Sequence, residues 1–517
     1  MAETRVVVVG AGIGGLVSAL LLAARGLEVT LVEAADAPGG KMRPVQVDGH
    51  AIDAGPTVFT MRWVFDELLH EVGSSLAALL PGLQPLELLA RHAWAADGSQ
   101  LDLHADRQRS ADAIAAWSSP AEGRRYLAFC DEAARVYAQL EGPHIRSSRP
   151  SFGRMVAELG PRGLATLAGL GPLATLATTL GKRFEDPRLR QLFGRYATYC
   201  GASPWAAPAT LMLVAHVEQE GVWAVPGGMG ALAQGFAGLL QARGGRIRYG
   251  ARCEAIETRA GRVAAVRLAG GERLEAEAVV FNGDAGALPA LLGGASRPLP
   301  PQGRSLSALT WATRTPTRGF ALTRHNVFFD TDYASEFDDV MRRRRLPQRG
   351  TVYVCAQDRL DGQTAAAGAP ERLLLLVNAP ADGDSRDFTD AETDACQTRA
   401  LNLLQRCGLQ LSLQPGTVRR TPADFHRLYP ATGGALYGPA SHGWMALFRR
   451  PSALTAVQGL VLAGGSVHPG PGVPMAAMSG RLAAATLMAR LGSTRRSARV
   501  LISGGTSMRS ATTAATR

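Results

Sequence analysis

The feature that most constrains this chain is a strand, a glycine-rich turn and a helix that follow one another within its first 26 residues. Residues 5–9 consist of Arg5 and four consecutive valines, and such a short, β-branched, apolar run is typical of a buried parallel strand. The next segment, Gly-Ala-Gly-Ile-Gly-Gly at 10–15, fits the pattern G-x-G-x-x-G. In residues 16–23, Leu and Ala recur at the spacing of one helix face, which predicts a helix. Gly26 is expected to end it. This order predicts an α/β fold that begins with a βαβ unit.

Each part of this unit suits the binding of a dinucleotide. Gly10 permits the tight turn, Gly12 lets a pyrophosphate approach the backbone, and Gly15 allows close packing of helix and strand. The helix N-terminus, where Gly14 also lies, offers free N–H groups to the phosphates. The second strand ends at Glu33, which can accept both ribose hydroxyls. A bare glycine turn without a ligand is the alternative, and the full strand–loop–helix–strand–Glu context argues against it.

The segments after Glu33 indicate which dinucleotide is bound. Residues 37–43 read Ala-Pro-Gly-Gly-Lys-Met-Arg, and residues 52–57 read Ile-Asp-Ala-Gly-Pro-Thr. Together they resemble the flavoprotein family that includes amine oxidases and carotenoid desaturases, in which a Gly-Gly-Arg segment wraps FAD. The resemblance implies FAD as the cofactor, with contacts from Gly39, Gly40, Lys41, Arg43, Gly55, Pro56 and Thr57. Lys41 replaces the usual arginine and Arg43 lies two residues on, so either can supply the cationic contact.

The composition agrees with a large enzyme. At 517 residues the chain can bury a sizeable core, and we expect two or more domains. The net charge of +11 comes almost wholly from arginine, because Lys41 and Lys182 are the only lysines. A solvated basic surface and attraction to anionic lipid explain this charge equally well, whereas nucleic acid is not expected because no binding motif accompanies it. The six cysteines lack C-x-x-C spacing, so no metal site or disulfide framework is expected.

Neither a signal peptide nor a transmembrane helix is predicted. Residues 1–4 are too short for a signal peptide and include an acid. The uncharged run 163–181 is broken by glycines, threonines and Pro172, so it is a poor membrane span. We expect a peripheral protein on the cytoplasmic side of a membrane, with residues 163–181 as the leading candidate for the lipid contact.

The order of helical and strand patterns predicts one nucleotide-binding domain interrupted by insertions. Residues 1–105, 222–290 and 451–492 are assigned to a discontinuous, Rossmann-like FAD-binding domain. Residues 106–221, which are mostly helical, and 291–450 are assigned to an inserted α+β substrate domain. Residues 493–517 carry little hydrophobic pattern and are expected to form a disordered tail.

A second glycine-rich signal lies near the C-terminus. Residues 459–465 read as a strand entering a glycine turn, 466–474 as a stiff loop, and 475–491 as a helix. A proline at a helix start, with glycines before it, leaves N–H groups that can stabilise negative charge on a reduced flavin. The expected cofactor contacts here are Gly464, Gly465, Ser466, Gly472, Val473 and Pro474. Related flavoproteins often carry an Asp after these glycines, so its absence favours the carotenoid-desaturase branch.

The resemblance extends over nearly the whole chain except the tail, through segments 10–15, 53–57, 279–284 and 468–474. These segments are similar to bacterial phytoene-desaturase-type enzymes, and most similar to 1-hydroxycarotenoid 3,4-desaturases. The resemblance implies desaturation at C-3,4 of an acyclic 1-hydroxy or 1-methoxy carotenoid such as 1-hydroxyneurosporene or rhodopin. It also implies a backbone contact from Cys253 to the adenine. The acceptor that reoxidises the flavin is left open.

Four titratable residues are candidates for a catalytic role. His216, Glu218 and Glu220 form a dense cluster just before a Gly-Gly turn, and His468 lies beside the second glycine-rich loop. At spacings of two and four along a helix, Glu218 points away from the other two. A purely structural role is the alternative for each of the four.

Three other functions stay open. A phytoene desaturase is the alternative within the same group, and an amine or protoporphyrinogen oxidase is the nearest enzymatic rival outside it. A non-catalytic prenyl-lipid-binding protein of the Rab-escort type shares the fold as well. The complete fingerprint ending in Glu33 argues against this last class.

Overall fold

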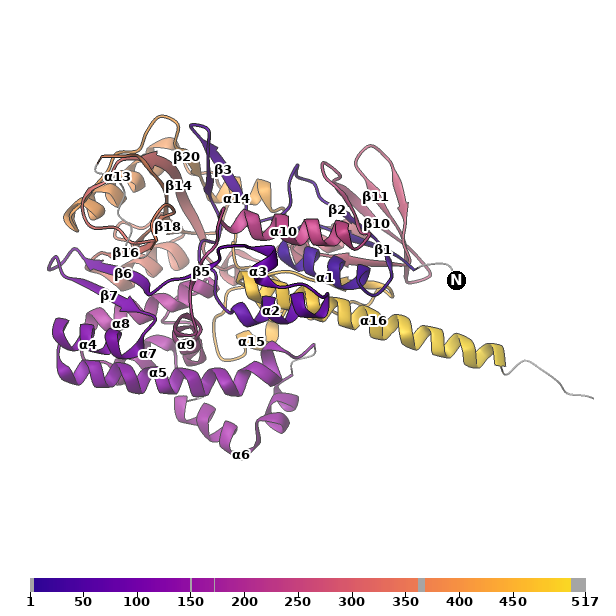
Figure 1. The fold of residues 1–517 in the computed structure, drawn as a ribbon, viewed down its shortest axis with the longest axis horizontal. Coiled ribbons are helices and arrows are strands. Elements are labelled where there is room, and N and C mark those ends of the chain that lie inside the picture. The colour runs from indigo at the N-terminus through magenta and orange to yellow at the C-terminus, as the bar shows by residue number, and fades with distance from the viewer. Residues whose placement is uncertain (1–3, 149–150, 172, 361–367, 504–517) are drawn as a thin grey trace, which may run out of the picture.

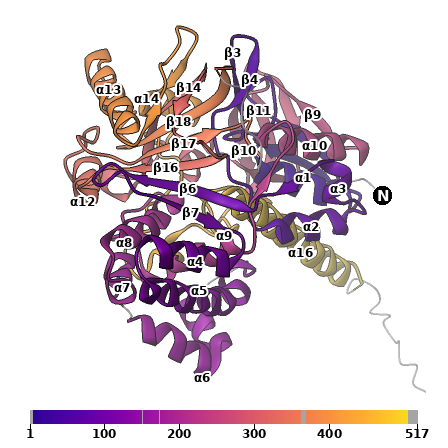
Figure 2. The same cartoon turned by 60° about the vertical axis from the view of Figure 1, so that its left-hand side comes forward.

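A computed structural model describes residues 4–148, 151–171, 173–360 and 368–503 of the chain. One part of the molecule carries the N-terminus and combines a sheet with several helices, and a second sheet lies beside it (Figure 1). A group of helices, from α4 to α9, lies beneath that second sheet (Figures 1 and 2).

A five-stranded parallel sheet forms the centre of the nucleotide-binding part, with the order β21-β13-β1-β2-β9. Its strands are β1 (Arg5–Val9), β2 (Glu28–Val32), β9 (Arg246–Arg248), β13 (Ala278–Phe281) and β21 (Leu460–Leu462). In β1, Val6 and Val8 belong to the core on one face, while Val7 and Val9 belong to the core on the other. A parallel strand covered on both faces requires this continuous apolar run, so the sequence prediction for β1 is confirmed.

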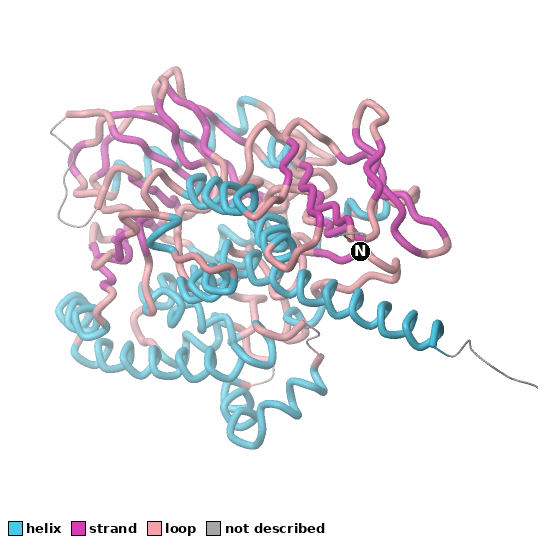
Figure 3. Tube along the Cα trace, turned by 45° about the vertical axis from the view of Figure 1, so that its right-hand side comes forward, coloured by secondary structure: helices cyan, strands magenta, loops and turns pink. Residues whose placement is uncertain are grey.

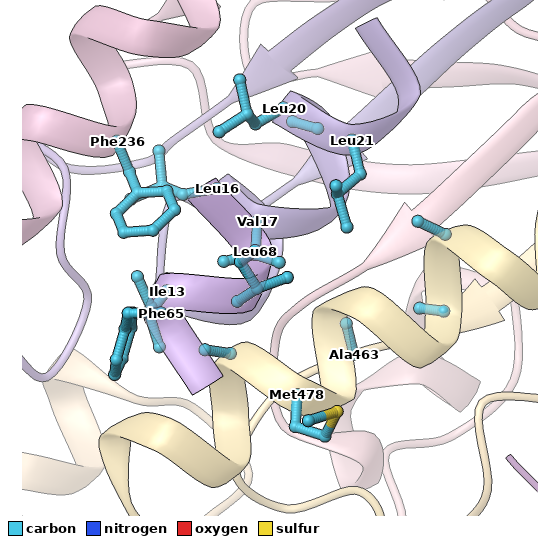
Figure 4. Packing of buried hydrophobic residues seen from close by; sticks show 14 of the residues in the cluster. Ile13, Leu16, Val17, Leu20, Leu21, Phe65, Leu68, Phe236, Ala463 and Met478 are labelled. Atoms are coloured by element: carbon cyan, nitrogen blue, oxygen red, sulfur yellow. The ribbon is translucent and has the colours of Figure 1, made fainter. Parts of the chain in front are cut away.

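Four helices cover one face of this sheet: α1 (Ile13–Ala23), α2 (Arg62–Glu71), α10 (Met229–Ala242) and α16 (Val473–Ser503). Every residue of α1 is buried, because the other three helices pack around it. Figure 4 shows Leu16 beside Phe236 of α10, and Leu68 of α2 close to Val17. The opposite face packs against a three-stranded antiparallel sheet of β10 (Cys253–Arg259), β11 (Arg262–Leu268) and β12 (Arg273–Glu275). The predicted Rossmann-like α/β fold is confirmed.

A seven-stranded mixed sheet forms the second part, with the order β20-β14-β18-β17-β16-β6-β7. Its strands are β6 (Leu88–Trp94), β7 (Gln100–His104), β14 (Ser307–Thr315), β16 (His325–Phe329), β17 (Val352–Ala356), β18 (Glu371–Ala379) and β20 (Val418–Arg420). Helix α13 (Asp390–Arg406) packs on one face through Leu403 and Leu404. The other face contributes Val327 and Phe329 to the core of the helical group.

The helical group consists of α4 (Arg107–Trp117), α5 (Pro120–Leu140), α6 (Phe152–Leu170), α7 (Leu176–Arg183), α8 (Pro187–Gly194) and α9 (Leu213–Gln219). Figure 3 shows these helices gathered apart from most of the strands. Helix α5 begins where Ser119 accepts a hydrogen bond from the Glu122 backbone and Pro120 occupies the first turn, a standard helix start. A 3-10 helix, η2 (Arg195–Cys200), follows α8 directly.

Two predicted boundaries differ from the structure. Strand β6, which lies in the segment 1–105 assigned to the cofactor domain, pairs in parallel with β16 and so belongs to the sheet of the substrate part. This pairing joins residues more than 200 positions apart, and no local pattern reports it. Helix α16 continues to Ser503, past the expected start of the tail at 493, and residues 504–517 lie outside the described part.

Among the described residues, no helix combines the length and the hydropathy that crossing a bilayer requires.

Candidate functional site

The glycine-rich loop between β1 and α1 is packed so tightly that side chains are excluded from it. Gly10 has a φ of 99° and donates its N–H to Val32 O at 2.8 Å. A Cβ added at Gly15 would lie 2.0 Å from Gly10 O, and one added at Gly12 would lie 2.8 Å from Asn282 Nδ2. No side chain of the described residues caps the start of α1, so the N–H groups of its first turn are available to a ligand.

Glu33 and the 39–40 turn complete the edge of this loop. The Glu33 carboxylate accepts hydrogen bonds from the Ala11 N–H at 2.7 Å and the Ala35 N–H at 2.9 Å. Gly39 donates its N–H to Ala11 O at 2.8 Å, and a Cβ on Gly40 would lie 3.2 Å from the Gly12 Cα. Segments 22 to 28 residues apart therefore meet around a common space. We call Gly10, Gly12, Gly14, Gly15, Gly39 and Gly40 the glycine cradle.

Asn282 is a site residue that sequence reasoning did not single out. It follows β13, the neighbour of β1, and its Nδ2 donates to Gly10 O at 3.2 Å. Its Oδ1 is buried and has no hydrogen-bond partner among the described residues. A Cβ on Gly14 would lie 2.7 Å from that oxygen. The signal was present in the sequence, because a polar residue directly after a buried strand lies at the carboxyl edge of the sheet, where ligands bind.

This arrangement fits FAD. The glycine cradle leaves a space that a Cβ would fill, the helix N-terminus is uncapped, and a carboxylate lies at the end of β2. The Asn282 Oδ1, which has no partner among the described residues, adds a polar group beside this loop, at the end of β13.

Of the two cations considered for the flavin contact, Lys41 turns inward. Its Nζ donates to Leu436 O at 2.6 Å and lies 5.4 Å from the centre of the Tyr429 ring. Burial lowers the pKa of Lys41 to about 8, opposed by nearby Asp284, while Arg450 lowers it further. Arg43 instead closes its own turn, because its Nε donates to Gly40 O at 3.0 Å. The structure therefore favours Lys41 as the interior cation.

The second glycine-rich loop joins the same region. Ala463 donates its N–H to Phe281 O at 2.9 Å, so the loop begins beside β13. A Cβ on Gly480 of α16 would lie 2.2 Å from Gly14 O, which makes the crossing of α16 and α1 a second place where only glycine fits. Ser466 Oγ accepts from the Ala285 N–H at 3.2 Å. The segment containing Gly464, Gly465, Ser466, Gly472, Val473 and Pro474 therefore runs alongside the glycine cradle.

The remaining predicted cofactor contacts are Cys253, which lies near the end of β2, and the 55–57 segment, which lies against Lys41 and the substrate part. Ala251 donates its N–H to Glu33 O at 2.8 Å, which places Cys253, two residues later, near the end of β2. Burial raises the pKa of the Cys253 thiol to about 11. In the segment of Gly55, Pro56 and Thr57, a Cβ on Gly55 would lie 1.9 Å from Lys41 O. The Thr57 hydroxyl hydrogen-bonds the Tyr353 hydroxyl at 2.8 Å, so this segment touches the substrate part.

The structure separates the three residues of the 216–220 cluster, as their helical spacing predicts. His216 Nε2 lies 3.8 Å from Glu220 Oε1, and the Glu220 side chain is 65% exposed. Glu218 is buried and accepts hydrogen bonds from the Tyr196 hydroxyl at 2.7 Å and from the Tyr199 hydroxyl. Of these three, only Glu218 faces the interior of the substrate part.

His468 is buried with a partner that sequence reasoning missed. Its Nε2 donates to His144 O at 2.8 Å, and the two imidazole rings are 4.7 Å apart. Burial lowers the pKa of His468 to about 4 and that of His144 to about 3, so both are neutral at pH 7. Both ring nitrogens of His144 and the Nδ1 of His468 lack partners among the described residues. No pattern in the sequence connects residues this far apart.

A cavity of about 290 Å³ lies apart from the glycine cradle. It is bordered by the hairpin of β3 (Pro44–Val47) and β4 (His50–Asp53), by the turn at 224–228, and by Arg324, Gln357 and Arg372. None of the predicted cofactor contacts lines it.

Comparison with known proteins shows the family to which the chain belongs. Residues 13–488 match the family described as flavin containing amine oxidoreductase. The chain is 62% identical over 515 residues to hydroxyneurosporene desaturase of Rubrivivax gelatinosus, covering 98% of each chain. It is 43% identical to the hydroxyneurosporene desaturase of Cereibacter sphaeroides, covering 95% of this chain and 98% of that one.

Solved structures agree on the fold. Putrescine oxidase superposes with a TM-score of 0.57 at 17% identity, covering 94% of this chain and 99% of that chain. Cyclohexylamine oxidase of Brevibacterium oxydans gives a TM-score of 0.55 at 16% identity, covering 95% and 100%. With the glycine cradle and Glu33 in place, the cofactor is FAD, and the chain belongs to the flavin-containing amine oxidoreductase family.

Proposed function

We propose that the protein is an FAD-dependent carotenoid 3,4-desaturase that acts on acyclic 1-hydroxy or 1-methoxy carotenoids. The observation that carries this proposal is the 62% identity to a hydroxyneurosporene desaturase across 98% of both chains. Identity of this extent includes both the cofactor part and the substrate part. A phytoene desaturase is the second candidate, supported by 30% identity to the zeta-carotene-forming phytoene desaturase of Myxococcus xanthus.

In this proposal the nucleotide-binding part, called the cofactor part from here on, holds the cofactor with residues from several segments of the chain. When bound, FAD supplies the hydride acceptor for the removal of two hydrogens from adjacent carbons. The glycine cradle and the N-terminus of α1 bind the pyrophosphate, Glu33 accepts the ribose hydroxyls, and the backbone at Cys253 contacts the adenine. Lys41, the 55–57 segment and the 464–474 loop enclose the flavin end and exclude water.

The second hydrogen leaves the substrate as a proton, which requires an acceptor. We retain His468 for this role, because it is neutral at pH 7 and its Nδ1 has no partner among the described residues. Glu218 is already bonded to two tyrosine hydroxyls, and Glu220 is largely exposed. His468→Gln keeps the hydrogen bond to His144 O, so flavin content should be kept while kcat falls by about 10²-fold or more.

A peripheral contact with the membrane belongs to the same proposal, since an almost apolar substrate partitions into lipid. Leu173 is 79% exposed, Trp444 47% and Trp205 45%. Backbone hydrogen bonds bring their segments together, from Gly443 N–H to Ala206 O at 2.8 Å and from Ala177 N–H to Pro204 O at 2.9 Å. We propose that this apolar face (Leu173, Trp205 and Trp444) rests on the cytoplasmic surface of the membrane.

This face refines the expectation for residues 163–181. Leu170 is buried in the helical core, with 6% of its surface exposed, so it cannot insert into lipid. The side chains of Leu164 and Leu167 lie outside the described part. Flotation with liposomes should weaken when Leu173, Trp205 and Trp444 are changed to Ser together, and should be unchanged by Tyr249→Ser, an exposed residue after β9. Equal flotation of both variants would remove the apolar face from the proposal.

The deciding assay offers the flavin-loaded protein a hydroxylated carotenoid, its methoxylated form and phytoene in lipid. Desaturation of the oxygenated substrates is the expected result, read from the red shift of the polyene spectrum. Conversion of phytoene, with the oxygenated substrates untouched, would establish the second candidate instead.

A further inference from the structure

Arg195 is a cation in the interior of the substrate part without a close carboxylate partner. Its guanidinium carbon lies 5.3 Å from the ring centre of Tyr199 and 5.6 Å from that of Tyr353. Tyr199 belongs to η2 and Tyr353 to β17, so the guanidinium lies between the helical group and the seven-stranded sheet. Its one hydrogen bond to a described residue is long, 3.5 Å from Nη1 to the Tyr199 hydroxyl. It forms no ion pair within the described part of the chain.

The arginine lies next to segments that border the cofactor region. The hydroxyl of Tyr353 hydrogen-bonds the hydroxyl of Thr57 at 2.8 Å, and Thr57 belongs to a predicted cofactor segment. Burial raises the pKa of Tyr437 to about 12, and the charge of Arg195 opposes that rise. Leu436, the neighbour of Tyr437, accepts the hydrogen bond of Lys41. Arg195 therefore lies where the substrate part meets the flavin end of the cofactor part.

The side chains around the guanidinium leave it partly accessible. Arg195, Tyr199, Tyr353 and Tyr437 keep accessible surface, although Tyr196 beside them is 3% exposed. Burial is nevertheless the main cause of the raised pKa of Tyr199, Tyr353 and Tyr437. A guanidinium in the interior that keeps accessible surface can be reached by a ligand, which a substrate-binding residue requires.

Glu218, which shares the Tyr199 hydroxyl with Arg195, is already bonded to other groups. Glu218 accepts from the hydroxyls of Tyr196 and Tyr199, so its two carboxylate oxygens face the tyrosines. A guanidinium carries five N–H donors and no acceptor, and most of those on Arg195 have no partner in the described part of the chain, which leaves them for a ligand. The two rings hold the planar group in place through cation–π contact.

We propose that Arg195 binds the terminal oxygen of the polyene substrate, an assignment that rests on the proposed function. A donor-only group recognises any oxygen that accepts a hydrogen bond, so it serves an alcohol and an ether alike. This explains how one site can take both 1-hydroxy and 1-methoxy carotenoids and still select against chains that end in hydrocarbon. Such a site discriminates because an unoxygenated chain leaves the buried donors unpaired.

Arg195→Met tests the assignment. For the hydroxylated and the methoxylated carotenoid, kcat/KM should fall on the order of 10- to 100-fold, because a hydrogen bond to a charged group is lost. For the unoxygenated carotenoid of the same conjugated length it should change by less than about threefold. Carotenoid retention by the apoprotein, followed by induced circular dichroism, should show the same selective loss without turnover.

Arg190→Met is the matched control. Arg190 lies five positions earlier and is exposed, and among the described residues its side chain donates to Phe184 O alone, so all three substrates should keep their wild-type values. Arg195→Lys keeps the charge but has three donors in place of five and lacks the planar shape, so it should lose part of the preference and retain more of it than Arg195→Met does.

The outcomes separate the two proposals. If Arg195→Met does not yield folded flavoprotein, Arg195→Lys and Tyr199→Phe are tested instead. In each variant, kcat/KM for the oxygenated substrates is divided by kcat/KM for the unoxygenated one, and the ratio is compared with that of the wild type. A ratio that is unchanged in both variants overturns the assignment. Equal losses on all three substrates would also overturn it, since they would mark a structural role. If the wild-type protein converts phytoene and leaves oxygenated carotenoids untouched, the proposed function itself fails.

Discussion

The cofactor part and the substrate part of this protein build their polar sites from different groups. In the cofactor part the site consists mainly of backbone, and the glycines leave room because their side chains are missing. In the substrate part it consists of interior side chains from three elements, Arg195 and Tyr199 of η2, Glu218 of α9 and Tyr353 of β17. A site made of backbone follows from a short sequence pattern, whereas a site made of distant side chains follows from packing. The two parts should therefore respond differently to substitution.

The largest effect is expected in the cofactor part. Gly12→Val should abolish FAD binding, because its Cβ would lie 2.8 Å from Asn282 Nδ2 and the side chain would occupy the pyrophosphate's place. Flavin released from the purified protein, measured by absorbance, should fall to background. Gly238→Ala on α10, where an added Cβ meets nothing within 4 Å, should keep full flavin. A yellow Gly12→Val protein would show that the cofactor lies elsewhere.

A second variant asks whether the substrate part is stabilised independently of the cofactor. Glu218→Leu leaves two buried tyrosine hydroxyls without their acceptor, which should lower the free energy of unfolding by about 3 kcal/mol. Urea unfolding of the apoprotein measures this loss. Glu220→Leu, two residues on and largely exposed, should stay within about 0.5 kcal/mol of the wild type. Equal effects for the two substitutions would contradict the burial of Glu218.

Asn282 tests whether a single side chain supports the backbone site. Asn282→Ala removes the hydrogen bond to Gly10 O and should weaken FAD binding about tenfold, as expected for roughly 1.4 kcal/mol. Titration of the apoprotein with FAD gives the dissociation constant. Asn402→Ala, an exposed position on α13, serves as the control. An unchanged affinity in Asn282→Ala would mean that the glycines hold the loop without it.

The smallest effect concerns pH. Burial lowers the pKa of Lys41 to about 8 from its ordinary value of 10.5, with Asp284 and Arg450 close by. Between these values the unfolded chain binds a proton that the folded protein lacks, so this group makes the folded apoprotein more stable as pH rises from 8 to 10. Lys41→Met should remove that contribution, and the difference in Tm from the wild type should change across this window. Lys182→Met, at the exposed other lysine, should leave the slope unchanged.

The sequence determined the cofactor part of this protein almost by itself. A strand covered on both faces must be continuously apolar, a tight turn against a neighbouring carbonyl must be glycine, and an acid at the end of β2 must lie near that turn. These are local requirements, so they leave a local pattern at Val6–Val9, at Gly10–Gly15 and at Glu33. The resemblance carried by these segments also predicted the family and FAD, and both are confirmed.

Only the tertiary structure decided how the substrate part is assembled. It placed β6 beside β16, brought His144 to His468, and set Arg195 between rings from two different elements. It also turned Glu218 inward while leaving Glu220 exposed. The physical reason is that a buried polar side chain needs partners, and any segment that packs nearby can supply them. Such partners can lie hundreds of residues apart, and no local rule of sequence links them.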